Sequence, residues 1–389
     1  MAIPYSQIPI DYEVVSQGDL NIDNKVRSNL FAWNGQFSPQ FIEVLLNNYS
    51  KETDVVFDPF LGSGTTLYES GRKQLPAFGT ELNPSAFFMA KVYEIINLDL
   101  AERRDVLREA ESVLAILKSE DDIVDVITTY IRAYSESYVS NLLSTLVVLL
   151  DIFNNELSLD LLAKKWDGLK DTVVKLPYSA ERISAHMGDA RCVPETDNSA
   201  TILITSPPYI NVFNYHQKYR RSVEALGYNV LAIAKNEFGS NRKNRGNRLL
   251  TVIQYCIDMA LSIKESCRVC APDSRMIYVV GRESSVLGYS FCNSQLIYEI
   301  CTEIFSLPFL LRQERVFKNR FGQLIYEDIL HFSCAKTIPP ADNETVIDGA
   351  RKIAVRMLEE KRETCPDNKN HILLYEAIMK SSQVKKSEG

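Results

Sequence analysis

A short apolar strand followed by a glycine-rich loop is the feature that most restricts the fold of this 389-residue chain. Residues 54–58 read Asp-Val-Val-Phe-Asp, and residues 59–66 continue Pro-Phe-Leu-Gly-Ser-Gly-Thr-Thr. The glycines allow positive φ, and the threonines stand where a helix would begin with free N–H groups. Such a loop holds a polar ligand at the carboxyl end of a strand in a doubly wound α/β sheet. It is neither a Walker A loop nor a dinucleotide loop, because no Gly-Lys-Ser/Thr follows and Leu67 replaces the third glycine.

A second predicted strand ends in an acidic residue. Residues 76–81 read Pro-Ala-Phe-Gly-Thr-Glu, so that Glu81 stands at the strand's carboxyl end. An acid at this place commonly binds a pair of ribose hydroxyls. Taken alone, a solvated strand end explains Glu81 as well.

A third segment joins an apolar run to two prolines. Residues 201–204 predict a buried strand, and residues 205–209 continue Thr-Ser-Pro-Pro-Tyr. Proline cannot continue a strand ladder and biases the preceding residue towards extended geometry, so the backbone is held open past the strand. A serine hydroxyl, unpaired carbonyls and a tyrosine face then suit a planar base that bears an amine. An ordinary strand-ending turn with a packed tyrosine is the alternative.

Together, residues 58–66 and 205–209 resemble the motifs of amino-methyltransferases that act on DNA bases, particularly the cytosine-N4 group. The resemblance covers about residues 29–95 and 180–335. It implies S-adenosyl-L-methionine as the cofactor and a catalytic loop made of Ser206, Pro207, Pro208 and Tyr209. The cofactor-binding residues that it implies are Phe37, Ser38, Pro39, Asp58, Pro59, Phe60, Gly62, Ser63, Gly64, Thr65, Thr66, Glu81, Asp189 and Ala190.

Besides Glu81, two groups of these residues lie outside the glycine-rich loop. Residues 37–40, which open a helix, are similar to the family's segment that closes over the methionine end of the cofactor. Asp189, in Gly-Asp-Ala-Arg, resembles the strand-end acid that faces the cofactor adenine. A turn cap is the other reading of Asp189.

The resemblance also implies a mechanism. Ser206 and the carbonyl of Pro207 would accept hydrogen bonds from the exocyclic amine of a flipped-out base, and Tyr209 would stack on that base. Transfer is direct, and no Pro-Cys pair of the kind used for ring-carbon methylation occurs. Serine ahead of Pro-Pro-Tyr favours cytosine-N4, whereas an adenine-N6 DNA enzyme, a guanine-N2 RNA enzyme and a non-catalytic nucleic-acid-binding subunit stay open. The cofactor loop precedes the catalytic loop, which departs from the commonest cytosine-N4 order.

The charge distribution favours a nucleic-acid partner, and the resemblance implies that this partner is double-stranded DNA. The net charge is −7, but basic residues gather downstream of the catalytic loop. Cationic side chains beside a site neutralise phosphates, while a solvated loop is the simpler explanation. The residues predicted to bind nucleic acid are Lys218, Arg220, Arg221, Arg242, Lys243, Arg245, Arg248, Lys318 and Arg320.

The predicted fold class is α/β, a doubly wound, Rossmann-like methyltransferase sheet with a C-terminal antiparallel hairpin and a helical insertion. Residues 1–28 form an N-terminal arm, and residues 29–97 and 176–338 form the catalytic domain. Residues 98–175 are the helical insertion, a target-recognition or partner-docking element, and residues 339–389 are a helical tail with a frayed end.

Composition predicts a cytoplasmic enzyme. The eight cysteines show no secreted-type framework. Cys267 and Cys270 form a lone CxxC pair, which helical packing explains better than half a zinc site, and the four histidines have no metal-site spacing, so no metal is expected. No apolar run approaches the roughly 20 residues that span a bilayer. The resemblance implies the modification half of a restriction-modification or related defence system, with cognate restriction or defence proteins as partners.

Overall fold

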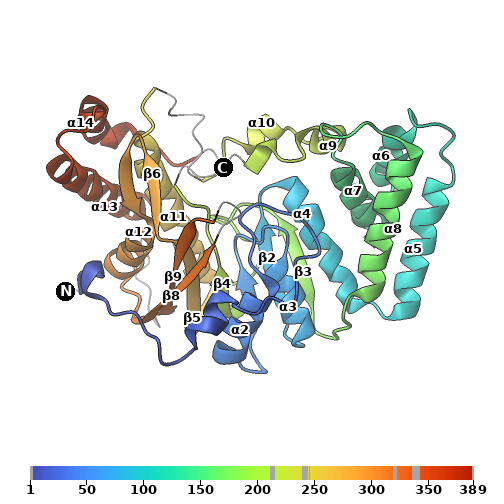
Figure 1. The fold of residues 1–389 in the computed structure, drawn as a ribbon, viewed down its shortest axis with the longest axis horizontal. Coiled ribbons are helices and arrows are strands. Elements are labelled where there is room, and N and C mark those ends of the chain that lie inside the picture. Colours follow the sequence, from blue (N-terminus) through green and yellow to red (C-terminus); the bar gives the residue numbers. More distant parts are fainter. Residues whose placement is uncertain are drawn as a thin grey trace.

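The computed structural model describes residues 3–210, 215–238, 244, 246–318, 322–334 and 342–387. Within them, a seven-stranded sheet runs in the order β3-β2-β1-β4-β5-β9-β8 (Figure 1). Its strands in chain order are β1 Val56–Asp58, β2 Ala77–Glu81, β3 Ile183–Met187, β4 Ala200–Thr205, β5 Cys270–Gly281, β8 Phe309–Lys318 and β9 Leu324–Ser333.

The strand order places the two predicted ligand loops side by side. β1 pairs in parallel with β2 on one side and with β4 on the other. The chain moves outward from β1 through β2 to β3 and then returns to β4, so the order reverses between β1 and β4. Ligands in open α/β sheets bind at such a switch point, beyond the carboxyl ends of the strands. The loops after β1 and β4 both start there.

The last two strands form the predicted antiparallel hairpin. β9 pairs antiparallel with β5, and β8 pairs antiparallel with β9. The expected α/β class, with its doubly wound sheet and closing hairpin, is therefore confirmed. A second small hairpin, β6 Glu283–Val286 with β7 Tyr289–Cys292, was not predicted.

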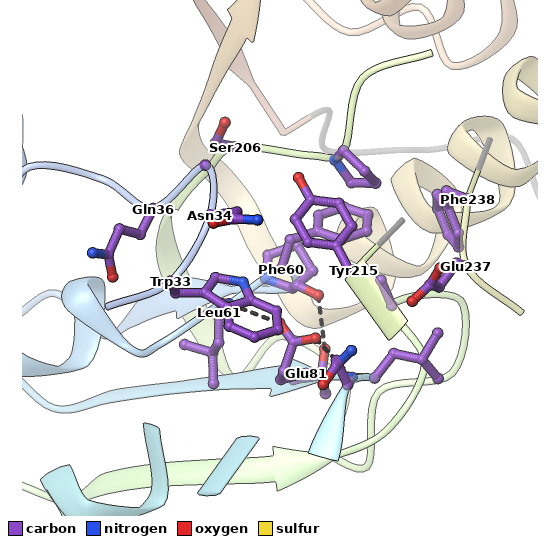
Figure 2. Close-up of a pocket in the computed structure, with 18 of the residues that line it drawn as sticks. Trp33, Asn34, Gln36, Phe60, Leu61, Glu81, Ser206, Tyr215, Glu237 and Phe238 are labelled. Carbon is purple, nitrogen blue, oxygen red and sulfur yellow. Dashed lines mark hydrogen bonds between the residues drawn. The ribbon is translucent and has the colours of Figure 1, made fainter. Parts of the chain in front are cut away.

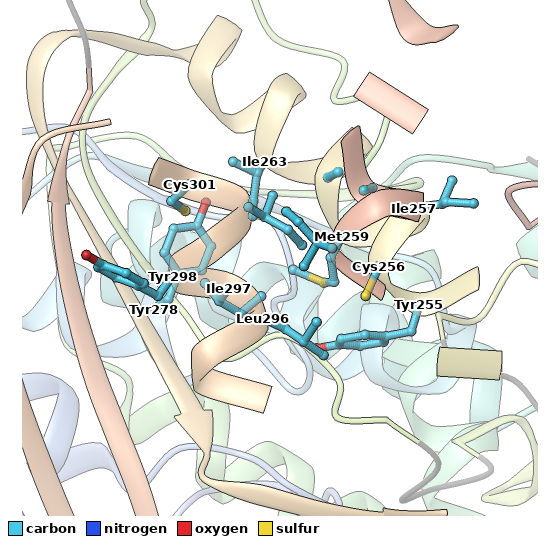
Figure 3. Close-up of a cluster of buried hydrophobic side chains, with 14 of the residues drawn as sticks. Tyr255, Cys256, Ile257, Met259, Ile263, Tyr278, Leu296, Ile297, Tyr298 and Cys301 are labelled. Atoms are coloured by element: carbon cyan, nitrogen blue, oxygen red, sulfur yellow. The ribbon is translucent and has the colours of Figure 1, made fainter. Parts of the chain in front are cut away.

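Both faces of the sheet are buried. Successive side chains of a strand point to opposite faces, so neighbouring residues enter different hydrophobic cores. Phe57, Leu203 and Tyr278 belong to one core, whereas Val56 and Ile202 belong to the other. The first core packs against α11 Leu250–Val269, α12 Asn293–Glu299, the π-helical turn η4 Ile300–Ile304, α13 Asn343–Thr364 and α14 His371–Met379. Figure 3 shows side chains of α11 and α12 in this core, together with Tyr278 of β5.

The opposite face is covered by helices from the first third of the chain. They are α2 Pro39–Tyr49, α3 Thr65–Arg72, α4 Pro84–Lys91 and the 3-10 helix η2 Val92–Asn97. α3 begins directly after the glycine-rich loop, with Gly64 at its N-cap in a left-handed conformation at φ 87°. A side chain at Gly64 would also meet Ala90 of α4 at 2.8 Å, so the loop packs closely on that helix.

Four helices occupy the stretch between η2 and β3, and Figure 1 shows them stacked beyond the edge of the sheet. They are α5 Leu100–Leu114, α6 Ile123–Ala133, α7 Tyr138–Leu150 and α8 Leu159–Lys175. α7 lies in the middle and contacts α4. Buried Arg103 ties the two ends of this stretch together, because its guanidinium donates to the carbonyl oxygens of Leu98, Leu176 and Pro177.

The N-terminal arm packs along the outer hairpin. It contains η1 Tyr5–Gln7 and α1 Gln17–Asn21. Tyr5 Oη donates to the buried carboxylate of Asp328 on β9 at 3.0 Å, and Asn21 Oδ1 accepts from the backbone N–H of Val316 on β8. The arm therefore completes the outer edge of the sheet.

The C-terminal segment differs from the frayed tail that was expected. After α14 and η5 Ser381–Gln383, Ser387 is fully buried. Its hydroxyl donates to Asp258 Oδ2 at 2.6 Å and its backbone N–H donates to Asp258 Oδ1. The expectation was wrong because a polar sequence carries no signal of a buried acceptor on a distant helix. Across the described part of the chain, no helix has the length and apolarity needed to cross a bilayer.

Candidate active site

A cavity opens where the loops after β1, β2, β3 and β4 converge (Figure 2). It encloses about 860 Å³ including its mouth. Aromatic and acidic side chains dominate its wall, among them Trp33, Phe60, Glu81, Asp189, Tyr215, Glu237 and Phe238.

The structure brings most of the predicted cofactor residues to this cavity. Those that line it are Phe37, Pro59, Phe60, Gly62, Thr65, Glu81, Asp189 and Ala190. Ser206 and Pro208 of the predicted catalytic loop also line it.

Six predicted cofactor residues lie outside this lining, and each has another contact. Ser63 donates to Gln36 Oε1 at 2.5 Å, and Gly64 packs on α4. Pro39 is buried at the start of α2, and Ser38 lines a neighbouring cavity. Asp58 and Thr66 are buried behind the cavity and hydrogen-bond to each other.

Glu81 sits at the end of β2 with both oxygens engaged. Oε2 accepts from the backbone N–H of Gly62 and Oε1 from that of Asn83, each at 2.8 Å. Burial raises the pKa of Glu81 to about 7, although these two hydrogen bonds lower it. The nearby carboxylates of Asp58 and Glu237 add to the rise. The Glu81 carboxyl therefore titrates near neutral pH.

Asp189 follows β3 and is held by the residue two positions later. Its Oδ1 accepts from the backbone N–H and the Nε of Arg191, and its Oδ2 accepts from Arg191 Nη2 at 2.5 Å. Arg191 in turn donates to buried Asp258 of α11 at 2.6 Å. The Asp189 carboxylate thus caps a turn, which is the alternative interpretation given for it from the sequence. Asp189 also lines the cavity.

Asp58 joins the two loops. Its Oδ2 accepts from the Thr66 hydroxyl at 2.7 Å, and its Oδ1 accepts from the Thr205 hydroxyl at 2.6 Å. Thr66 lies in the first turn of α3, and Thr205 directly precedes Ser206. Burial raises the pKa of Asp58 to about 6, while the hydrogen bonds from Thr205, Thr66 and the backbone of Phe60 oppose the rise.

The segment before α2 closes over one side of the cavity. Trp33 stacks on Tyr215, with ring centroids 6.0 Å apart and planes 19° apart. Lys218 Nζ donates to Ala32 O at 2.8 Å and lies 5.3 Å from the Trp33 ring centroid. Asn29 Nδ2 donates to both Phe37 O and Thr65 Oγ1, which fixes the segment to the start of α3.

A second, wider cavity of about 2020 Å³, including open solvent, lies on the other side of the Ser-Pro-Pro-Tyr loop. Its wall includes Tyr209, Gly281, Arg282, Arg315, Phe317, Tyr326 and Glu327. Gly35, Gln36, Phe37 and Ser206 line both cavities. The two spaces are therefore neighbours that share a wall, to which Ser206 belongs.

The hydroxyl groups of the Ser-Pro-Pro-Tyr loop form a short hydrogen-bonded chain. Tyr209 Oη donates to Glu327 Oε1 at 3.2 Å and lies 3.4 Å from Ser206 Oγ. Glu327 also accepts from Arg315 at 3.2 Å. Burial, reinforced by the charge of Glu327, raises the pKa of Tyr209 well above its usual value, so its hydroxyl stays protonated. With Tyr209 donating to Glu327, the Ser206 O–H is free to donate to Tyr209.

The predicted nucleic-acid residues do not form one cluster in the described part of the chain. Arg220 pairs with Glu224 on α9 Arg220–Ala225, and Arg221 lies 5.2 Å from the Phe153 ring centroid. Half-buried Arg248 lies near the start of α11, and exposed Lys318 ends β8. Arg242, Lys243, Arg245 and Arg320 lie outside the described residues.

Several cavity residues were missed by the sequence analysis. Trp33, Gln36, Tyr215 and Glu237 belong to no motif, and Glu237 follows the short helix α10 Val230–Ile233. His216, in η3 Tyr215–Gln217, is buried, and its Nδ1 lies 2.8 Å from Oε2 of Glu237. The one available signal was proximity, because Trp33 and Gln36 precede the closing residues 37–40 by a few positions.

Comparison with known proteins finds similarity to DNA methyltransferases. Residues 15–92 match the N6_N4_Mtase family model, described as DNA methylase. The type II methyltransferase M.MvaI of Kocuria varians is 24% identical over 341 residues, covering 64% of this chain and 74% of that protein. M.MjaII of Methanocaldococcus jannaschii is 26% identical over 113 residues, covering 28% of this chain and 21% of that protein.

Among solved structures, a SAM-dependent methyltransferase from Methanosarcina mazei aligns with a TM-score of 0.36 at 10% identity, over 75% of this chain and 98% of that one. The family model and the two type II methyltransferases are the matches that bear on function. These matches support a DNA methyltransferase with S-adenosyl-L-methionine as its cofactor, and they do not separate cytosine-N4 from adenine-N6 specificity.

Proposed function

We propose that this protein transfers a methyl group from S-adenosyl-L-methionine to the exocyclic N4 amine of cytosine in double-stranded DNA. The observation that carries the proposal is that Ser206 lines both cavities. A methyltransferase needs a cofactor site and a substrate site that meet at the reacting atoms. Serine, rather than asparagine or aspartate, ahead of Pro-Pro-Tyr supports cytosine over adenine.

The first cavity fits this cofactor by the chemistry of its wall. Trp33, Phe60 and Tyr215 offer aromatic surface to a flat adenine ring, and Glu81 offers carboxylate oxygens to ribose hydroxyls. The acidic side chains also suit the positive charge of a sulfonium and an ammonium group. When bound there, S-adenosyl-L-methionine supplies an electrophilic methyl group.

The second cavity would take the target base. A base inside a duplex is out of reach, so enzymes that modify it flip it out and offset the cost of a few kcal/mol inside their pocket. Tyr209 would stack on the flipped base. Ser206 donates its O–H towards Tyr209, so its oxygen keeps lone pairs for the N–H groups of the cytosine amine. The carbonyl of Pro207 would accept the second N–H, and the amine nitrogen is thereby oriented for attack.

The wider biological role follows from the resemblance and the relatives. We propose that the enzyme is the protective methyltransferase of a restriction-modification or related defence system. The helices α5–α8 would read the DNA target or dock a partner protein. The exposed basic residues Arg221 and Lys318 would contact phosphates.

Identification of the methylated base tests this function. Duplex DNA is incubated with the protein and labelled S-adenosyl-L-methionine, digested to nucleosides and separated by mass. We expect label in N4-methylcytosine. Label in N6-methyladenine would move the assignment to the adenine branch, label in RNA alone would point to the guanine-N2 reading, and cofactor binding without transfer to either would favour a non-catalytic subunit.

Cofactor affinity should depend on pH through Glu81. Its pKa near 7 means that the carboxylate form, which accepts ribose hydroxyls, prevails above neutral pH and is lost below it. We expect the Kd of S-adenosylhomocysteine to rise as pH falls from about 8 to about 6, with proton release on binding at neutral pH. Calorimetry in buffers of different ionisation enthalpy measures both effects. Glu81→Gln should flatten the profile, and an unchanged profile would contradict the role.

Gly281→Ala should separate substrate handling from cofactor binding. A Cβ at Gly281 would lie 2.5 Å from Cε2 of Tyr209, so the ring must leave its place against β5. We expect the rate of methyl transfer to fall by about tenfold or more. S-adenosylhomocysteine should bind as before, because Gly281 lines the second cavity and not the first. Gly168→Ala on α8 is the control: nothing lies within 4 Å of its Cβ, so activity stays and stability rises by up to about 1 kcal/mol.

A further inference from the structure

Glu237 presents a carboxylate oxygen that has no hydrogen-bond partner, in the wall of the first cavity. Its Oε1 atom is buried, and the whole side chain is 11% exposed. An unpaired buried acceptor is uncommon in folded proteins, because its desolvation costs about 1–3 kcal/mol. A ligand that donates a hydrogen bond at this place would satisfy it.

The other acidic residues of the cavity are already paired. Glu81 accepts from two backbone N–H groups, and both oxygens of Asp189 accept from Arg191. Among the described carboxylates that line this cavity, Glu237 is therefore the one with a buried oxygen, Oε1, that has no hydrogen-bond partner in the protein.

The orientation of Glu237 is set by a buried histidine. Nδ1 of His216 lies 2.8 Å from Oε2 of Glu237, and His216 is 3% exposed. This contact occupies one carboxylate oxygen and leaves the other for the cavity. Figure 2 shows Glu237 beside Tyr215 and Phe238 on the wall across from Trp33.

The surroundings of Glu237 suit a flat ring. The neighbouring Phe238 meets Phe60 edge to face at 5.3 Å, and the Arg191 guanidinium lies 5.0 Å from the Phe238 ring centroid. Arg191 thus lies against Phe238, which follows Glu237 in the chain, and it also donates to Asp189. Glu237 and Asp189 therefore belong to the same end of the cavity. An acceptor at the edge of aromatic walls recognises a planar ring that carries an N–H donor.

We infer that Glu237 binds the adenine of the cofactor by accepting a hydrogen bond from its exocyclic amine, with His216 as the positioning residue. The inference rests on the proposed function only for the identity of the cofactor. It gives the cavity a means of rejecting a ligand whose ring carries a carbonyl at that position, because two acceptors would then face each other.

Binding of two ligands tests the inference. S-adenosylhomocysteine carries the amine, and S-inosylhomocysteine carries a carbonyl in its place. We expect wild-type protein to prefer the adenosyl compound by about 10- to 100-fold in Kd, the range for a hydrogen bond to a charged group. Glu237→Gln should bind S-adenosylhomocysteine about tenfold more weakly and lose the preference, because a glutamine amide can donate to the inosine carbonyl.

Two further variants complete the experiment, with circular dichroism as the check of folding. Glu237→Asp keeps a charged acceptor and should retain the adenosyl preference at reduced affinity. Glu224→Gln removes an exposed carboxylate of α9 that pairs with Arg220, and it should bind both ligands as wild type does. Equal weakening of both ligands by Glu237→Gln, or no change, would overturn the inference. Failure of DNA methylation by a wild-type protein that binds S-adenosylhomocysteine would overturn the proposed function alone.

Discussion

Ser206→Ala is expected to lower kcat for DNA methylation by about 10²- to 10³-fold, the cost of removing one preorganised hydrogen-bonding group from an active site. Ser206 is the residue of the Ser-Pro-Pro-Tyr loop that lines both cavities. Without its oxygen, one N–H of the target amine loses its acceptor, and the amine is no longer oriented towards the methyl group. Affinity for S-adenosylhomocysteine should change by less than about threefold, because the acidic and aromatic wall of the first cavity stays in place.

The measurement is transfer of labelled methyl groups to duplex DNA under single-turnover conditions, with calorimetry for cofactor affinity. Ser199→Ala is the matched control. The Ser199 hydroxyl donates to the carbonyl of Thr196 just before β4, and Ser199 lines neither cavity, so its loss should leave kcat unchanged. A Ser206→Ala enzyme that turns over within threefold of wild type would remove Ser206 from the mechanism.

The fold was predictable where local sequence patterns coincide with strand ends. The Asp54–Asp58 run with its glycine loop, and the Thr201–Ile204 run with its prolines, each mark a strand and the turn after it. Their adjacency then follows from the topology of a doubly wound sheet, since both strands border the switch point. The hairpin β8–β9 was predictable for the same local reason, whereas β6 and β7 have only 4 residues each, too few to mark a strand by pattern.

Side chains that reach the site from distant segments were not predictable. Trp33 and Tyr215 are 182 positions apart and stack only because the closing segment folds over the loop after β4. Charge counting assigned Lys218 to phosphate contacts, but its ammonium donates to Ala32 and faces Trp33. Glu237 and Glu327 belong to no motif at all. Tertiary packing decides these contacts, and a single sequence holds no record of it.

Asp58 illustrates the difference between a motif residue and its role. Its position in the glycine-loop motif implied contact with the cofactor, yet its carboxylate is 1% exposed and links Thr66 to Thr205. We expect Asp58→Asn to lower kcat and cofactor affinity together, each by about tenfold or more, and to reduce the free energy of unfolding by about 1–3 kcal/mol. The amide offers one acceptor where two hydroxyls now donate.

The pH dependence of this variant separates a positioning role from a merely structural one. With a pKa near 6, Asp58 is ionised and accepts both hydroxyls at neutral pH. Acidification below about pH 6 should therefore lower kcat in the wild type, and Asp58→Asn should lack that step. The contribution of Asp58 to the free energy of unfolding changes with pH in the opposite direction to kcat. Because the folded pKa lies above the usual 3.8, the unfolding free energy contributed by Asp58 is greatest in acid and falls as pH rises through about 6.

Single-hydroxyl variants assign the two halves of the Asp58 link. Thr205→Val should lower kcat with cofactor affinity nearly unchanged, because Thr205 leads into Ser206. Thr66→Val should weaken cofactor binding first, because Thr66 lies in the first turn of α3, beside the loop that forms the cavity wall. If Asp58 couples the loops, the double variant loses less than the sum of the two single losses, since either substitution already frees one loop from the other. Strict additivity would mean that the carboxylate supports each loop independently.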